Sequence, residues 1–225
     1  MSTKRLTVVQ CWDDGVCTDI RLVEVLRRYG AAASFNLCAG LHRNKRSFGW
    51  AHAGADVYRL GWDEMRDVYQ GFAIANHSMS HPRLDLIAPD AAEREIREGR
   101  ERLQQFFGQS VSGFAYPFGA YNETLRRLVR DAGHAYARTC ESADDVFPPQ
   151  DAMRFHPTCH FLAPDFWQKY EQARQCGVFY FWGHSYEILT NAMWQDFELT
   201  IQRISDDPHS RWGEVGGLFD NRSFE

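Results

Sequence analysis

Short apolar runs alternate with amphipathic stretches along the chain, and this alternation predicts a parallel α/β fold. Runs rich in β-branched and aromatic residues predict strands at residues 6–11, 32–37, 72–75, 113–116, 135–139, 153–155 and 178–182. Apolar positions at helical spacing predict helices at residues 20–29, 62–69, 89–107, 123–132, 164–175 and 191–204. Strands that alternate with helices pair in parallel through crossover connections. We therefore expect about seven parallel strands in one domain over residues 1–225, as a small barrel or an open doubly wound sheet.

Two stretches show how clearly the pattern separates helix from loop. The helix at residues 89–107 begins with Pro and Asp, is followed by Gly108, and carries Glu and Arg at helical spacing. These features indicate a helix with a solvated charged face. The polar stretch at residues 41–56 has no such period, and we expect it to form a loop at the rim of the fold.

Polar side chains follow nearly every predicted strand. In a parallel α/β fold the carboxyl ends of all strands lie on one face, which is where binding sites are built. We therefore expect one site to include the polar residues that follow the strands, which are Asp13, Asp14, His77, His81, Arg138, Glu141, His156, His160 and His184.

Two of these strand ends carry residue types that bind a divalent cation. Adjacent carboxylates such as Asp13 and Asp14 disfavour each other's ionisation, and a bound cation would relieve that repulsion. His77 and His81 are four residues apart in the segment NHSMSH, a spacing that puts two imidazoles on one side of a helical turn. Asp-Asp-Gly is also ordinary turn chemistry, so it is the combination of the two segments that favours a metal site.

A second pair of histidines has the same spacing but weaker support. His156 and His160 enclose a proline in the segment HPTCH and have no adjacent carboxylate pair. A proline makes a regular helical turn at this point less natural. We expect this pair to line the pocket or to support the metal ligands, with a structural role and a second metal site as the alternatives.

Four short segments, in their order along the chain, resemble the motifs of a known enzyme family. CWDDG, HSMSH, YPFG and WGHS are similar to the motifs of the polysaccharide deacetylases, carbohydrate esterase family four, from about residue 6 to residue 186. The resemblance implies a distorted (β/α) barrel, usually of seven strands. It also implies one divalent metal ion and the hydrolysis of N-acetyl or O-acetyl groups.

The resemblance implies a role for five residues. Asp14, His77 and His81 would hold the metal ion, Asp13 would be the catalytic base, and His184 would be the general acid. Zinc is the expected ion, and cobalt, nickel or iron would also suit Asp and His ligands. Such an ion makes water a nucleophile near neutral pH, and a histidine can protonate a leaving amine.

The chain departs from the family pattern at its third and fourth motifs. Ala115 stands where the family usually has the arginine that orients the base, so Arg138 or Arg154 would have to replace it. We expect Glu141 to stand in for the acidic residue of the fourth motif. Aromatic rings at the mouth could stack on a sugar, and the Tyr116 N–H could assist the acyl oxygen. The remaining residues expected in the pocket are Trp12, Tyr116, Pro117, His160 and Trp182.

Composition and charge narrow the functional classes. The net charge is −5 without a basic tract, so there is no nucleic-acid footprint. No apolar stretch reaches the roughly 18 residues that span a bilayer, and the N-terminal residues lack the apolar core of a signal peptide. Six dispersed cysteines without a Cys-x-x-Cys pair indicate reduced thiols. We expect a cytoplasmic protein. The sequence does not determine its oligomeric state, and the aromatic-rich C-terminal third could form the interface of a homo-oligomer.

The expected function is the metal-dependent removal of an acetyl group from an N-acetylated or O-acetylated sugar or glycoconjugate. Hydrolysis of another linear or cyclic amide C–N bond is an alternative that uses the same residues. Two His and one carboxylate also form the facial triad of iron oxygenases. A non-catalytic carbohydrate-binding protein is a further alternative, because two motifs lack family residues.

Overall fold

The computed structural model describes residues 5–144 and 146–219. Eight strands form one sheet around β1 (Leu6–Asp13), in the spatial order β7-β6-β5-β2-β1-β9-β8 with β10 also beside β1. All pairings within it are parallel. The remaining strands of the sheet are β2 (Ser34–Leu37), β5 (Ala73–Asn76), β6 (Gly113–Ala115), β7 (Tyr136–Arg138), β8 (Cys159–His160), β9 (Val178–Gly183) and β10 (Ser210–Trp212).

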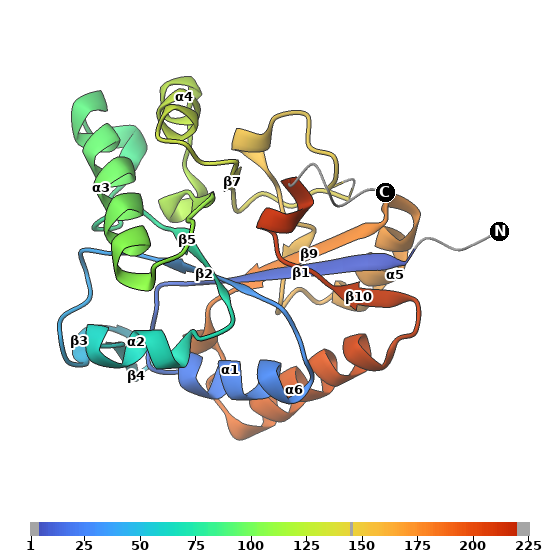
Figure 1. Ribbon diagram of the computed structural model, residues 1–225. Coiled ribbons are helices and arrows are strands. Elements are labelled where there is room, and N and C mark those ends of the chain that lie inside the picture. The colour runs from blue at the N-terminus through green and yellow to red at the C-terminus, as the bar shows by residue number, and fades with distance from the viewer. Residues whose placement is uncertain (1–4, 145, 220–225) are drawn as a thin grey trace.

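Helices follow most of the strands and cover the outside of the sheet. In Figure 1, the helices α1 and α6 run below β1, and α3 and α4 stand on the opposite side near β5 and β7. Strands covered in this way are buried on both faces, which explains why β1 reads as a nearly continuous apolar run. The helices are α1 (Asp19–Arg28), α2 (Trp62–Val68), α3 (Pro89–Phe107), α4 (Glu123–Asp131), α5 (Phe166–Cys176) and α6 (Asn191–Asp206).

The sheet curls into a distorted (β/α) barrel, which confirms the predicted fold class. Phe155 forms a parallel bridge to Arg138 of β7, while β8 pairs with β9. The short segment from residue 155 to residue 160 therefore connects the two edges of the sheet. The predicted strand at residues 153–155 is wrong, because the chain there forms the 3-10 turn η3 (Ala152–Arg154), in which the Met153 N–H donates to the Asp151 carboxylate.

The predicted rim loop at residues 41–56 is also wrong, because much of it is an antiparallel hairpin. Strands β3 (Ser47–His52) and β4 (Ala55–Arg59) are joined by Ala53 and Gly54, both with positive φ. That backbone suits a tight hairpin turn, in which Asn-Gly or Asp-Gly is the usual signal, and Ala-Gly is a weak one. Hydrogen bonds from the Leu60 N–H to the Gly15 carbonyl (3.0 Å) and from the Cys17 N–H to the Tyr58 carbonyl (2.8 Å) attach the hairpin to the loop after β1.

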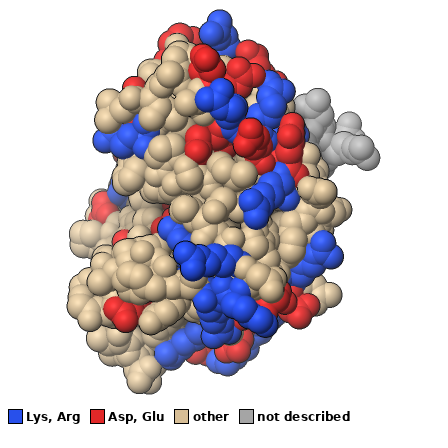
Figure 2. All heavy atoms as spheres, turned by 90° about the vertical axis from the view of Figure 1, so that its left-hand side faces the viewer, with Lys and Arg blue, Asp and Glu red and all other residues tan. Residues whose placement is uncertain are grey.

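The surface carries both charges. Figure 2 shows one face of the molecule, on which Lys and Arg side chains lie among Asp and Glu side chains. Neither sign forms a continuous surface on this face. Within the described ranges, no helix is both long and apolar enough to cross a membrane.

Candidate active site

The two carboxylates after β1 are set by a turn of unusual backbone conformation. Asp14 and Gly15 both have positive φ, at 83° and 68°. A Cβ at position 15 would lie only 2.7 Å from Cε1 of His42, so the turn needs glycine there for space as well as for conformation. The Asp14 N–H donates to the Asn36 carbonyl at 3.0 Å, which ties the turn to β2. Both aspartates are buried.

His77 and His81 come together as predicted, but through a different local structure. The segment after β5 is not helical, and Ser78 and His81 have positive φ. Ser78 Oγ accepts a hydrogen bond from the His81 N–H at 2.9 Å, and Glu95 of α3 accepts from the Ser80 N–H at 2.7 Å. A tight turn held from two sides therefore brings the Nε2 atoms of the two histidines to 3.1 Å from each other.

Asp14, His77 and His81 fit a divalent metal ion. One donor atom from each of them lies within 4.8 Å of the other two. His77 Nδ1 lies 2.8 Å from the Ala115 carbonyl, which can only accept a hydrogen bond. Nδ1 therefore carries the proton, and the Nε2 lone pair faces His81. Two nitrogen ligands of a tetrahedral zinc ion lie roughly 3.3 Å apart, close to the separation of the two Nε2 atoms.

Backbone strain is concentrated around these donor atoms. Four of the five non-glycine residues with positive φ among the described residues are Asp14, Ser78, His81 and Phe118. The ring of Phe118 lies 4.6 Å from that of His81, so all four positions belong to one site. Such conformations cost free energy and persist where a site requires them.

Asp13 is held next to these candidate metal ligands but by different partners. Arg138, the last residue of β7, reaches across the barrel and forms a buried ion pair with Oδ2 of Asp13. Asn36 donates to Oδ1 at 2.6 Å. Burial alone would raise the pKa of Asp13, but Arg138, the nearby histidines and Asn36 outweigh burial and hold the pKa well below its usual value. Asp13 is therefore ionised at neutral pH.

Arg138, rather than Arg154, is the arginine that forms an ion pair with Asp13. Its guanidinium also lies over the ring of Trp182, with Cζ 4.5 Å from the ring centroid. Arg154 lies in η3 and lines a separate cleft of about 280 Å³ with His156 and the loop before η3. The two arginines that the sequence left as alternatives are thus distinguished by position.

His184 follows β9 and faces the two aspartates. Its Nε2 lies 3.8 Å from Oδ2 of Asp13 and 4.0 Å from Oδ2 of Asp14. Its Nδ1 lies 3.1 Å from Oε2 of Glu187, at ion-pair distance although the approach is not aligned for a hydrogen bond. Burial would lower the pKa of His184, but Glu187 and the two aspartates outweigh it and raise the pKa.

Glu187 is the main residue of the site that sequence reasoning missed. It lies in the short 3-10 turn η4 (Ser185–Glu187), and its Oε2 is 2.9 Å from Nε2 of His160 as well as 3.1 Å from Nδ1 of His184. Burial would raise the pKa of Glu187, but contacts with the two histidines outweigh burial and lower it to about 2. The available signal was the spacing of three residues after His184.

Glu141, which was expected to stand in for the acidic residue of the fourth motif, lies away from His184. It accepts a hydrogen bond from the hydroxyl of Tyr121 at 2.9 Å, lies 4.0 Å from Nε2 of His156 and has an exposed side chain. His156 is bonded to Thr139 through Nδ1. The pair His156 and His160 is therefore divided, and only His160 reaches the group around His184.

Three of the predicted pocket residues are placed differently from expectation. Trp12 is fully buried, packs against Phe161 and cannot stack on a substrate. Tyr116 is also fully buried, and its N–H donates to the Arg138 carbonyl at 3.0 Å, so this N–H cannot assist an acyl oxygen. Pro117 is buried too. Trp182 is half-buried, with its ring 5.5 Å from that of His184.

Phe118 is the residue of the third motif that reaches the site. Its ring is 60% exposed beside His81. Among the described residues its N–H has no hydrogen-bond partner, whereas the N–H groups of Tyr116 and Gly119 are both used. The N–H that the sequence suggested, that of Tyr116, is therefore occupied, and within the part of the chain that the structure describes the unbonded N–H of this motif is that of Phe118.

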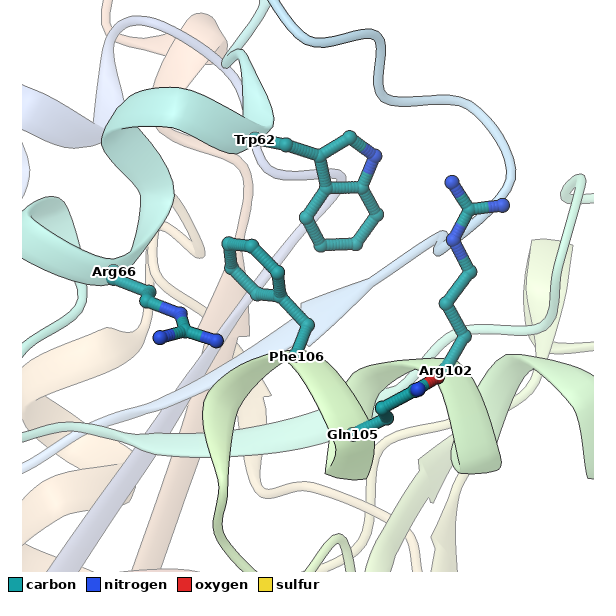
Figure 3. A pocket seen from close by; sticks show the side chains of 5 residues that line it. All are labelled: Trp62, Arg66, Arg102, Gln105 and Phe106. Atoms are coloured by element: carbon teal, nitrogen blue, oxygen red, sulfur yellow. The ribbon is translucent and has the colours of Figure 1, made fainter.

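A second hollow lies away from this site. A cleft of about 340 Å³ between α2 and α3 is lined by Trp62 and Phe106, whose ring centroids are 4.4 Å apart. Figure 3 shows these two rings together, with Arg66 and Arg102 on either side. Neither the candidate metal ligands nor His184 line this cleft.

Comparison with known proteins agrees with this geometry. The family model described as polysaccharide deacetylase matches residues 1–137. A curated relative from Bacillus subtilis (strain 168), YxkH, whose name assigns it to the polysaccharide deacetylases, is 24% identical over 136 residues. That match covers 60% of this chain and 44% of YxkH, so the chain spans less than half of its curated relative.

Two solved structures show the same fold at low sequence identity. The Xyl-CE4 domain of a multidomain xylanase from the hindgut metagenome of Trinervitermes trinervoides is 16% identical, with a TM-score of 0.60 over 96% of this chain and 90% of that domain. BA3943 from Bacillus anthracis, described as a CE4 family pseudoenzyme, is 12% identical, with a TM-score of 0.62 over 97% of this chain and 66% of BA3943.

Proposed function

Because the chain belongs to the polysaccharide deacetylase family, we propose that it is a metal-dependent hydrolase that removes an acetyl group from an N-acetylated or O-acetylated sugar or glycoconjugate. The observation that carries this proposal is the convergence of three metal-binding groups with an ionised carboxylate and a histidine. Asp14, His77 and His81 lie on one side of this group, and Asp13 and His184 complete it.

The three proposed ligands define where the ion would bind. A divalent cation, zinc being the expected one, would supply Lewis acidity and an activated water molecule. His77 keeps its Nε2 free because its Nδ1–H is bonded to the Ala115 carbonyl, which fixes the ring's tautomer and orientation. Asp14 supplies the negative charge of the ligand set.

Asp13 and His184 would then move the protons of the reaction. Asp13 is ionised and rigidly held by Arg138 and Asn36, so it can accept a proton from the attacking water. An amine is a poor leaving group and requires a proton, which His184 can supply from Nε2. The free N–H of Phe118 is placed in the same site and can donate to the oxygen of the acyl group.

The substrate class follows from the family and remains a proposal. The exposed ring of Phe118 beside His81 and the ring of Tyr186, 4.9 Å from that of His184, offer apolar faces to a sugar. A sugar conjugate in the cytoplasm remains the expected substrate. The same groups would hydrolyse another amide C–N bond, and a substrate panel would separate the two.

Acetate release from a panel of N-acetylated and O-acetylated sugars tests the proposal. The zinc-loaded wild type should release acetate from at least one member, and His81→Ala should not. His156→Ala is the matched control, because it removes a histidine of the second His-x-x-x-His pair and should keep the activity. Sugar binding without acetate release by the metal-loaded wild type would favour a non-catalytic protein, as the pseudoenzyme relative is described to be.

A further inference from the structure

We propose that Glu187 is a positioning residue that holds His184 in the orientation and tautomer needed for proton donation, and that His160 in turn holds Glu187. This inference rests on the proposed function. It concerns a group of residues that lies beyond the stretch matched by the family model, which ends at residue 137.

One carboxylate oxygen organises the group. Oε2 of Glu187 lies 2.9 Å from Nε2 of His160, 3.1 Å from Nδ1 of His184 and 3.0 Å from the backbone nitrogen of His184. An ionised carboxylate can only accept hydrogen bonds, so each nitrogen that faces it carries a hydrogen. Nδ1 of His184 lies at ion-pair distance from this carboxylate, which favours a proton on Nδ1, and Nε2 is left to face the two aspartates.

A backbone contact fixes the tautomer of His160. The Leu162 N–H donates to Nδ1 of His160 at 3.3 Å. Nδ1 of His160 is therefore an acceptor without a proton, and the proton of the neutral ring is on Nε2, facing Glu187. The Leu162 N–H thus donates to His160, and the Nε2–H of His160 faces Glu187. Glu187 also accepts a hydrogen bond from the backbone N–H of His184.

Buried contacts fix the turn that carries Glu187. The hydroxyl of Ser185 donates to Oδ1 of Asp19 and lies 2.7 Å from the hydroxyl oxygen of Thr18. Ser185 and Asp19 are both fully buried. The turn is therefore pinned against the start of α1, and the carboxylate of Glu187 has a fixed place beside His184.

The arrangement assigns a specific part of the reaction to Glu187. In the step that expels the amine, the C–N bond breaks, its electron pair goes to nitrogen, and the proton on Nε2 of His184 moves to that nitrogen. The proton that the water loses goes to Asp13, so proton uptake and release balance. Glu187 keeps its charge throughout and acts only through its ion-pair contact with Nδ1 and its hydrogen bond from the backbone N–H of His184.

The need for a proton on the leaving group gives a test that a purely structural role would not satisfy. 4-Nitrophenyl acetate has a leaving group that departs without protonation, whereas an N-acetylated sugar needs the acid. Glu187→Gln should lower kcat for the N-acetyl substrate about 10- to 100-fold and leave kcat for the aryl ester nearly unchanged. Glu141→Gln is the matched control, because Glu141 is exposed and does not contact His184, and it should change neither rate.

Other outcomes would overturn the assignment. An equal loss on both substrates, or no loss on either, would show that Glu187 does not act through His184. If Glu187→Gln does not fold, His160→Asn keeps the carboxylate and should show the same selective loss at a smaller size. The three groups also lie close enough to hold a metal ion, so two zinc ions per chain in the wild type would replace positioning by metal binding. A wild type that cleaves the aryl ester but no acetylated sugar would instead defeat the proposed function, and the acid role with it.

Discussion

The two sides of the site are built in different ways. The proposed metal-binding side comes from turns directly after β1 and β5, where Asp14 and His81 have left-handed backbone conformations. The acid side comes from β8, β9 and η4, where His160, His184 and Glu187 meet at one carboxylate oxygen. The first side depends on local backbone conformation within short motifs, and the second depends on contacts between separate segments. A site can therefore keep one side of its family pattern while the other side is supported by different residues.

The largest expected effect is on the metal-binding side. Asp14→Ala should lower acetate release about 10³-fold or more, because Lewis-acid stabilisation of several kcal/mol is lost. Chelation of the wild type should have the same effect, and added zinc should restore the wild type but not the variant. An Asp14→Ala enzyme with near-normal activity would remove the distinction between the two sides.

The next largest effect is expected from the substitution of His184, the proposed general acid. His184→Ala should lower kcat for an N-acetylated sugar about 10²- to 10⁴-fold, the usual contribution of a general acid, while zinc remains bound. Rates with 4-nitrophenyl acetate and bound zinc should be measured on the same preparation. Loss of zinc together with activity would place His184 among the metal ligands rather than opposite them.

Arg138 contacts both Asp13 and Trp182. Its removal should lower the free energy of unfolding. Arg138→Met leaves Asp13 buried without its counter-charge, which typically costs about 3–5 kcal/mol in the free energy of unfolding. Urea unfolding of the metal-free protein measures this directly. Arg154→Met is the control, because Arg154 lies in η3 away from Asp13, and it should leave the unfolding midpoint nearly unchanged.

The smallest expected effect concerns Asp19, whose carboxylate accepts a hydrogen bond from Ser185 in the turn that carries Glu187. Burial outweighs the hydrogen bonds from Ser185, Tyr69 and the Val16 N–H and raises the pKa of Asp19 to about 7, above its usual value of 3.8. Between pH 4 and pH 7 the folded state then binds a proton that the unfolded state has lost, so this group's contribution to stability falls as pH rises.

Asp19→Asn removes that titration, and the comparison with wild type isolates it. The stability of the variant relative to wild type should improve as pH rises from 4 to 7, by at most about 1.4 kcal/mol per pH unit. Urea midpoints at several pH values measure the difference. A difference that stays constant over this range would mean that Asp19 is ionised throughout.

The sequence predicted the fold class and the convergence of Asp14, His77 and His81 because both depend on local signals. The alternation of strand and helix patterns, with polar residues at the strand ends, indicates the barrel. The motifs DDG and HSMSH, in this order, indicate the three candidate metal ligands. The hairpin at Ser47–His52 and Ala55–Arg59 was missed because its Ala-Gly turn carries a weak signal and its short strands are mostly not buried. Trp12 was placed at the mouth because strand-end position does not tell which face of a strand a side chain occupies.

The acid side could be predicted only in part. His184 was expected in the site because it stands at a strand end, and Glu141 was expected to stand in for the acidic residue of the fourth motif. The carboxylate that the structure brings to Nδ1 of His184 is that of Glu187, from a turn three residues further along the same segment. Arg138 and Arg154 could not be distinguished, because the ion pair with Asp13 spans the barrel between β1 and β7.

Metal content, measured by elemental analysis on zinc-loaded and desalted protein, tests the division of the site most directly. We expect about one zinc ion per chain in the wild type and in Glu187→Gln, and none in folded His81→Ala. No bound ion in a well-folded wild type would contradict the metal site and with it the hydrolytic mechanism. Loss of the ion in Glu187→Gln would show that the two sides are one metal-binding unit.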